Sequence, residues 1–280
     1  MTPEQLLKQL SLGQDGIYSA HFTNQEQSEE IKMREEVAKE VPQDYLDTLS
    51  IHHSIPVMDQ EVTTFISQIP KNGFIIDVGG CWGWHWRTIE AQRPDLNIVI
   101  VDFIRTNLHY ASQVLGDRIN KNIYLVHGDA TQLPFDHETF DGYWSVQALQ
   151  HIPSFSIAIS EAHRVLKSGG AFSNYSLNNQ ICVRSLYKIL GKHYHLKGEV
   201  PGSFFLERAS KAQYQSISAT FGSRPTQRFT EVLFSPELKI TSPGRLGSLL
   251  GKIDCLLSLN IPLFKGIARQ HSFHCIKQRT

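Results

Sequence analysis

A short apolar run that ends in a glycine-rich turn constrains this chain more than any other feature. Residues 74–83 read FIIDVGGCWG, and a second apolar run over 97–101 ends in another acid, Asp102. A buried parallel strand that opens into a glycine turn lets backbone N–H groups approach a ligand closely, and an acid after the next strand suits the two hydroxyls of a ribose. The pair therefore predicts a site for an adenosine-containing cofactor, and by itself leaves open which one.

The bulk composition fits a globular protein and argues against nucleic acid as a main partner. Of the 280 residues, 41% are hydrophobic and 19% are charged, and Lys+Arg and Asp+Glu both number 27. A protein that binds nucleic acid normally carries a surplus of basic residues, because phosphate contacts need them. With a formal net charge of zero, no nucleic-acid partner is expected.

The cysteines and the apolar runs indicate the cellular compartment in which the protein is expected. The four cysteines, at positions 81, 182, 255 and 275, form no CxxC pair, so neither structural zinc nor a disulfide framework is expected. The first residues show no basic start followed by an apolar stretch, and no window holds eighteen consecutive apolar residues. We therefore expect a cytoplasmic protein without a secretory signal or a transmembrane segment. Peripheral membrane contact and the oligomeric state stay open.

Strands and helices alternate through the centre of the chain. Strand candidates are residues 74–79, 97–102, 123–127, 140–145 and 170–175, with two later ones at 228–234 and 271–276. Helical stretches are expected over 58–69, 83–91, 105–115, 154–166 and 206–221, the last closed by Gly222. This alternation predicts βαβ units, and hence a parallel sheet with right-handed crossovers.

Three further motifs follow the later strands. His127-Gly-Asp129-Ala130 follows the third strand, FDGYWSVQALQHI over 140–152 covers the fourth, and RVLKSGG over 164–170 leads into the fifth. In this order and spacing they resemble the class I S-adenosylmethionine-dependent methyltransferases, particularly the small-molecule branch, over roughly residues 58–176. The resemblance implies a three-layer α/β/α sandwich with a mostly parallel seven-stranded sheet whose last strand is antiparallel.

The resemblance also implies an activity and a cofactor. It indicates transfer of a methyl group from S-adenosyl-L-methionine to a small-molecule or lipid-like acceptor by in-line displacement. The positions that match the cofactor-binding residues of the family are Asp77, Gly79, Gly80, Gly83, Asp102, Phe103, Asp129, Ala130, Ser145, Val146 and Gln147. Asp77 and the glycine turn would wrap the methionine part, and Asp102 would accept hydrogen bonds from the ribose. Residues 129–130 would meet the adenine edge, and residues 145–147 would hold the ammonium and face the acceptor.

The resemblance divides the chain at residue 56. Residues 1–56 form a predicted N-terminal helical extension or lid, with a helix over 28–41 whose charged run is assigned to a solvated face. Residues 57–280 form the predicted methyltransferase domain, with insertions at about 178–205 and 236–270. The first insertion reads as irregular. The leucine-rich second one is expected to cover the sheet edge, with a membrane-surface or greasy-substrate role as the alternative.

One histidine is a candidate for the chemistry, and no metal is expected. His151 lies one to two helical turns beyond the fourth strand, which makes it the first candidate for a general base. Such a base is needed only if the acceptor arrives protonated, and simple packing is the alternative reading. His52-His53 and the pair His193 and His195 lack a nearby acid and a third ligand, so they are interpreted as loop histidines.

One departure from the family pattern leaves alternatives open. Cys81 stands where the family usually has glycine, so the loop must carry a thiol side chain beside Gly80. A non-catalytic relative that keeps the fold is therefore one alternative. An NAD(P)-dependent oxidoreductase is another, although the turn supplies at best two of the three glycines of GxGxxG. The acceptor, and whether oxygen, nitrogen or carbon is methylated, are not indicated.

Overall fold

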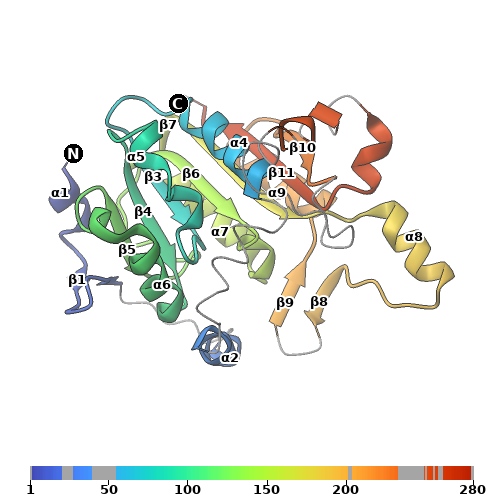
Figure 1. The fold of residues 1–280 in the computed structure, drawn as a ribbon, viewed down its shortest axis with the longest axis horizontal. Coiled ribbons are helices and arrows are strands. Elements are labelled where there is room, and N and C mark those ends of the chain that lie inside the picture. The colour runs from blue at the N-terminus through green and yellow to red at the C-terminus, as the bar shows by residue number, and fades with distance from the viewer. Residues whose placement is uncertain are drawn as a thin grey trace.

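The computed structural model describes residues 2–20, 28–39, 55–200, 204–232, 249, 251–254, 256–257 and 261–278 (Figure 1). The strands are β1 (Ser11–Leu12), β2 (Tyr18–Ser19), β3 (Phe74–Val78), β4 (Asn97–Asp102), β5 (Ile123–His127), β6 (Phe140–Val146), β7 (Leu166–Leu177), β8 (Lys197–Val200), β9 (Phe204–Glu207), β10 (Thr226–Thr230) and β11 (Gln270–Ile276). The α-helices are α1 (Pro3–Leu7), α2 (Ser28–Lys39), α4 (Ile55–Ile66), α5 (Ile89–Gln92), α6 (Arg105–Leu115), α7 (Phe155–Val165), α8 (Ile181–Ile189) and α9 (Lys211–Phe221). Short 3₁₀ helices are η1 (Trp84–Trp86), η2 (Gly116–Arg118), η3 (Leu149–His151) and η5 (Pro262–Gly266).

A nine-stranded sheet runs through the described part of the chain in the order β1-β2-β5-β4-β3-β6-β7-β11-β10 (Figure 1). β3 pairs in parallel with β4 and β6, and β5 and β7 continue the parallel pairing outward. β11 is antiparallel to both of its neighbours, β7 and β10. The predicted mostly parallel sheet with an antiparallel last strand is therefore confirmed. Because parallel strands end on the same side, the carboxyl ends of β3, β4, β5 and β6 meet at one edge.

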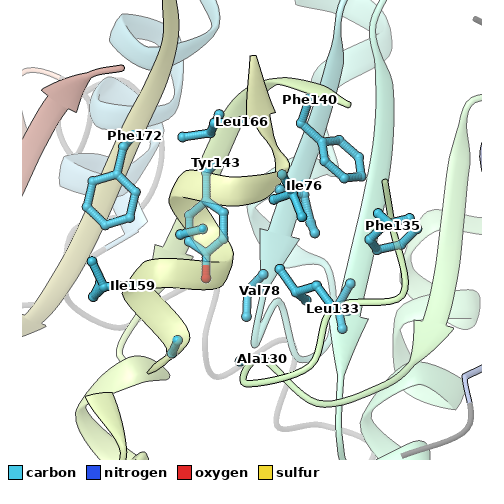
Figure 2. Close-up of a cluster of buried hydrophobic side chains, with 14 of the residues drawn as sticks. Ile76, Val78, Ala130, Leu133, Phe135, Phe140, Tyr143, Ile159, Leu166 and Phe172 are labelled. Carbon is cyan, nitrogen blue, oxygen red and sulfur yellow. The ribbon is translucent and has the colours of Figure 1, made fainter. Parts of the chain in front are cut away.

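An apolar layer covers each face of the sheet. Ile75 and Ile76 are both fully buried but belong to opposite layers, because successive side chains of a strand point to opposite faces. The layer of Ile76 packs against α7 and α9, and Figure 2 shows Ile159 of α7 beside Phe172 of β7. The layer of Ile75 packs against α4 and α6. The predicted three-layer α/β/α sandwich is thus confirmed.

Two short strands near the N-terminus extend the sheet beyond the seven that the sequence predicts. β2 pairs in parallel with β5, with Tyr18 opposite Val126, and β1 pairs antiparallel with β2. The chain reverses between them at Gly16, whose φ is +78°. A two-residue strand has no alternation of apolar and polar residues to detect, so the sequence pattern gives no sign of it. The division of the chain at residue 56 stays a prediction.

The segment after β7 has regular structure where it is described, so the prediction that residues 178–205 are irregular is wrong, whereas their being an insertion stays a prediction. It contains the helix α8 and an antiparallel hairpin of β8 and β9, which Figure 1 shows projecting from the body of the molecule. Lys197 of β8 lies opposite Glu207 of β9, and the two form an ion pair at 2.7 Å. The hairpin therefore has both backbone and side-chain links between its strands.

Two predicted helices have different bounds in the structure. The helix expected over 206–221 begins at Lys211, because residues 204–207 belong to β9 and the hydroxyl of Ser210 caps the first turn. Its predicted end at Gly222 is confirmed, with φ at +62°. The stretch expected over 83–91 divides into η1 and α5. Most of the predicted insertion at 236–270 lies outside the described residues.

The N-terminal helix α2 is held beside α6 by one carboxylate. Glu35 accepts hydrogen bonds from the backbone N–H of Arg105 at 2.6 Å and from the N–H and hydroxyl of Thr106. These residues begin α6, and the first N–H groups of a helix have no partner within the helix. The negative charge also lies at the favourable end of the α6 dipole. Glu35 therefore accepts hydrogen bonds from the start of α6 and links α2 to it. Figure 1 shows α2 near α6.

Replacing Glu35 by alanine should lower the free energy of unfolding by about 1–2 kcal/mol, because the start of α6 loses its acceptor. Urea denaturation followed by circular dichroism would measure this. Glu36→Ala is the matched control, since Glu36 is exposed and pairs with Lys39 at the surface, and it should leave the midpoint unchanged. Equal loss in the two variants would contradict the capping role of Glu35.

Candidate active site

A cavity of about 280 Å³ lies at the carboxyl ends of β3, β4 and β6, with α2 forming part of its wall. Most of the residues that the sequence predicts for the site line it, namely Gly79, Asp102, Phe103, Asp129, Ala130, Val146, Gln147 and His151. Asp77, Gly80, Gly83 and Ser145 do not line it and support the residues that do. The fold thus brings the predicted positions to one place, while their roles toward a ligand stay predictions.

The glycine turn after β3 requires glycine at both of its ends. Gly79 has φ at +71°, and a Cβ there would come within 2.1 Å of the Cβ of Ala148. Gly83 has φ at +65°, and a Cβ there would come within 2.5 Å of a methyl carbon of Leu115. Side chains rarely adopt such φ values, and neither site has room for one. Gly79 therefore lets the backbone itself form the cavity wall.

Cys81 lies in this turn with φ at +49°, a conformation that favours glycine. Its backbone N–H donates a hydrogen bond to Oδ2 of Asp102 at 3.0 Å, and the residue lines the cavity. Burial raises the pKa of its thiol well above the usual value, and the charge of Asp102 adds to this effect. The departure from the usual glycine thus places a neutral, unreactive sulfur in the wall.

Asp102 is a buried carboxylate at the end of β4. Its carboxylate accepts hydrogen bonds from the backbone N–H groups of Cys81 and Ile104, the latter at 2.8 Å. Asn107 lies beside it on the cavity wall and accepts a hydrogen bond from the indole N–H of Trp82 at 3.1 Å. Burial raises the pKa of Asp102 to about 6, although the two backbone hydrogen bonds oppose this. Near neutral pH it is therefore a carboxylate that can accept hydrogen bonds from ligand hydroxyls.

Asp77 lies directly below the glycine turn and outside the cavity. A Cβ at Gly80 would come within 2.5 Å of its Oδ2, which also accepts a hydrogen bond from the indole N–H of Trp86 at 2.7 Å. Its Oδ1 has no hydrogen-bond partner among the described residues. Burial raises the pKa of Asp77 to about 7, and the charge of Asp102 raises it further. Asp77 therefore supports the turn and changes protonation near neutral pH.

The loops after β5 and β6 complete the wall. The backbone N–H and hydroxyl of Thr131 donate to Oδ1 of Asp129 at 2.8 and 2.9 Å, which fixes that carboxylate at the cavity. Ser145 is fully buried, and its hydroxyl donates to the carbonyl of Val78 at 2.8 Å, so it ties β6 to β3. Gln147 then turns the chain with φ at +52°.

His151 lines the cavity as a neutral imidazole with both ring nitrogens hydrogen-bonded. Its Nδ1 lies 2.7 Å from the carbonyl of Phe205, so Nδ1 carries the proton. The amide of Gln150 has its oxygen on the N–H of Leu177, which leaves its NH₂ to donate to Nε2 of His151 at 3.2 Å. Burial lowers the pKa of His151 to about 4, and the charge of Arg34 lowers it further. His151 is therefore a neutral hydrogen-bonding group at physiological pH.

Arg34 of α2 also lines the cavity, and the sequence analysis missed it. Its Nε pairs with Glu30 at 2.8 Å and its guanidinium lies over the ring of Phe204 at 5.0 Å. Its Nη2 is buried and has no hydrogen-bond partner among the described residues. The assignment of this charged run to solvent is therefore wrong for Glu30, Arg34 and Glu35. No motif surrounds Arg34, so only the position of α2 in the fold could have identified it.

Two further features concern metals and membranes. In the described ranges, no group of three His, Cys, Asp or Glu side chains could hold a metal ion. The rings of His193 and His195 lie 5.9 Å apart, whereas His52 and His53 lie outside the described residues. Of the helices that the structure describes, none is long and apolar enough to cross a membrane.

Comparison with known proteins matches the centre of the chain. Residues 76–173 match the family described as a methyltransferase domain. The ubiquinone/menaquinone biosynthesis C-methyltransferase of Methylobacterium nodulans is 31% identical over 99 residues, which are 35% of this chain and 39% of that protein. The sterol 24-C-methyltransferase of Kluyveromyces lactis is 33% identical over 111 residues, which are 38% of this chain and 29% of that protein. The chain therefore spans less than half the length of these relatives.

A solved structure with a similar fold covers more of the chain. The 1,6-didemethyltoxoflavin-N1-methyltransferase of Burkholderia thailandensis, solved with 1,6-didemethyltoxoflavin and S-adenosylhomocysteine, has a TM-score of 0.57 over 93% of each chain. At 11% identity this likeness shows the fold alone. Together with the family match over residues 76–173, it makes this chain similar to the class I methyltransferases in its central sequence and in its fold.

Proposed function

We propose that this protein is a methyltransferase that uses S-adenosyl-L-methionine and methylates a small-molecule or lipid-like acceptor. The observation that carries the proposal is a single cavity that brings together Gly79, Asp102 and Asp129. These residues come from the ends of three parallel strands, the place where open α/β sheets bind their ligands. The match to the methyltransferase domain family covers all three of them.

The residues at the cavity suit the proposed cofactor. Gly79 lines the cavity with backbone alone, because a Cβ there would collide with Ala148, and Asp102 offers acceptor oxygens for ribose hydroxyls. The buried, unpartnered Nη2 of Arg34 suits a carboxylate, and S-adenosyl-L-methionine carries one on its methionine part. Asp129 and Ala130 would meet the adenine edge, with Phe103 packing on the ring. The cavity would thus offer an acidic group, Asp102, to the ribose of a ligand and a basic group, Arg34, to its carboxylate.

The protein would contribute to catalysis mainly by positioning the acceptor against the cofactor and by excluding water from the cavity. When bound, the cofactor supplies an activated methyl group on a sulfonium, so no nucleophilic side chain is required. Aligning the acceptor with that methyl group can contribute several kcal/mol, on the order of known intramolecular effects. Val146 and Gln147 form the wall at the end of β6, where an acceptor would lie. α2 closes the same cavity from the N-terminal side, which limits access of water.

His151 remains our candidate general base if the acceptor arrives protonated. Its neutral state leaves Nε2 as an acceptor, although the amide of Gln150 donates to that atom. A pKa of about 4 makes the imidazole a weak base. An acceptor that is already deprotonated would not require His151 to remove a proton. In that case His151 would instead orient the acceptor by hydrogen bonding.

The nature of the acceptor rests on the relatives. Two of them are named for quinone biosynthesis and for sterol methylation, both of which concern apolar small molecules. The matched residues exclude α2 and everything after β7, so the particular acceptor does not carry over. We therefore propose only an acceptor class, small and apolar or lipid-like, and a cytoplasmic location remains part of the same proposal.

Calorimetry with the product S-adenosylhomocysteine and with NAD tests the proposed cofactor. We expect measurable heat of binding with S-adenosylhomocysteine and none with NAD, because the turn lacks the full dinucleotide pattern. Measurable binding of NAD without measurable binding of S-adenosylhomocysteine would instead favour an oxidoreductase. Binding without turnover across a panel of phenols, quinols and sterols would favour a non-catalytic relative of the family.

Asp102→Asn should weaken S-adenosylhomocysteine binding by roughly 1–3 kcal/mol, or about fivefold to 150-fold, because an acceptor of ribose hydrogen bonds is lost. Since the pKa of Asp102 is about 6, wild-type affinity should also fall as the pH drops below 6, when the carboxyl group becomes protonated. The variant should lack this dependence on pH. Isothermal titration between about pH 8 and pH 5 measures both effects.

The matched control for this experiment is Asp141→Asn. Asp141 is a carboxylate of β6 that pairs with Lys167 at 2.9 Å, away from the cavity wall. Its variant should bind S-adenosylhomocysteine as the wild type does. Unchanged affinity in Asp102→Asn, or an equal loss in both variants, would mean that the ribose site is misplaced.

His151→Asn should lower kcat by about 10²–10⁴-fold if His151 is the general base, with little change in the affinity for S-adenosylhomocysteine. The base must be neutral, and burial lowers its pKa from 6.5 to about 4. The wild-type kcat should therefore stay level as the pH falls through 6.5 and decline only near 4. The control is His163→Asn on α7, outside the cavity wall. An unchanged kcat in His151→Asn would rule out His151 as the general base.

A further inference from the structure

The helix α8 presents an apolar face that no described part of the chain buries. None of its described side chains is buried, and Ile189 is 81% exposed. Leu186 and the following Leu190 are exposed as well, and helical spacing puts them on one side with Ile189. Figure 1 shows α8 projecting away from the sheet, beyond the β8–β9 hairpin. Exposed apolar residues that gather on one helix face are unusual on a protein surface and mark an interaction site.

The same segment is basic, although the whole chain is neutral. Arg184 and Lys188 lie four residues apart on the side of α8 opposite Leu186, and Lys192 follows shortly after the helix. No Asp or Glu occurs between Glu161 and Glu199. Among the described residues, none of these three basic side chains forms an ion pair. The helix therefore combines an exposed apolar face with an unneutralised positive one.

A second exposed apolar region lies where the start of α8 meets η5. Leu263 of η5 is 70% exposed. Leu263 and Ile181 of α8 line the same open groove, of about 770 Å³, and Phe229 forms part of its floor. Lys265 lies at this groove with its ammonium 5.6 Å from the Phe229 ring centroid. Two segments that are distant in sequence thus build one apolar surface with basic side chains at its margin.

We propose that α8 and η5 form a docking surface for a phospholipid bilayer that contains anionic lipids. An amphipathic helix with apolar residues on one face and Lys or Arg on the other lies in the plane of such an interface. Each basic residue near the surface adds an attraction to anionic headgroups. The nine residues of α8 are too few to span a bilayer. The charge of the patch therefore favours a lipid surface over a second copy of this neutral chain.

The docking surface begins at the edge of the sheet that carries the candidate active site. α8 follows β7, which ends at the same edge of the sheet as the cavity, and β9 of the same insertion carries the carbonyl that binds His151. A lipid-like acceptor leaving the bilayer would therefore approach the edge of the sheet that carries the cavity. This route rests on the proposed function, whereas docking itself does not.

Cosedimentation of the full chain with vesicles tests the docking. We expect binding to phosphatidylcholine vesicles with about 30% phosphatidylglycerol, and at least several-fold less to phosphatidylcholine alone. Salt at about 0.5 M should reduce the bound fraction, because it screens the attraction to the headgroups. No binding to either kind of vesicle would overturn the proposal.

Paired variants locate the surface. Leu186→Glu with Ile189→Glu should reduce the vesicle-bound fraction about tenfold or more, because both side chains would enter the interface. Ile157→Glu is the matched control, since Ile157 is 51% exposed on α7 and should have no effect. Thermal unfolding and S-adenosylhomocysteine binding should be unchanged in all variants, which separates this test from the proposed function.

Two results of the variant experiment would contradict the docking surface. Equal vesicle binding by the paired variant and the wild type would place the membrane contact elsewhere. Light scattering after gel filtration gives the other check. If the wild type were a dimer that Leu186→Glu with Ile189→Glu converts to a monomer, the apolar face would be an interface between copies of this chain.

Discussion

The carboxylate of Asp102 holds the glycine turn against the end of β4, and the shape of the cavity depends on this contact. It accepts hydrogen bonds from the N–H of Cys81 in the turn and from the N–H of Ile104 after the strand. Both N–H groups lie where the chain leaves the sheet and lose their ladder partners, so a buried acceptor has to replace them. The turn then brings Gly79 against Ala148, where only glycine fits.

This arrangement concentrates two acids in a small buried volume. Asp77 supports the turn from below and Asp102 holds it from the side, and burial raises the pKa of both, to about 7 and about 6. A buried carboxylate is unfavourable unless hydrogen bonds compensate it, and one oxygen of Asp77 has no such bond among the described residues. Perturbed acids of this kind cluster at functional sites more than at structural ones. The same burial keeps the Cys81 thiol neutral, so its departure from glycine does not introduce reactivity.

Sequence patterns predict the core well because its strands are buried on both faces. Residues 74–78 are wholly apolar apart from Asp77, and their strand matches the prediction to within one residue. Patterns fail where an element depends on what it touches. β2 has two residues and exists because the edge of β5 is available. The sequence predicts Arg34 to be a solvated helix residue, whereas contacts of α2 with α6 and β9 bring it to the cavity.

The mouth of the cavity is built from two segments that lie outside the family match. Arg34 of α2 stacks on Phe204 of β9, and Glu30 accepts a hydrogen bond from the N–H of Phe205 at 3.4 Å. The carbonyl of Phe205 in turn fixes the ring of His151. Of the residues that line the cavity, all except Arg34 lie within the matched residues 76–173, and Arg34 and its neighbours in β9 lie outside them. On the proposed function, the matched strand ends would hold the ribose and adenine of the cofactor, and Arg34 would meet its carboxylate. Likeness over residues 76–173 can then indicate the chemistry without indicating the acceptor.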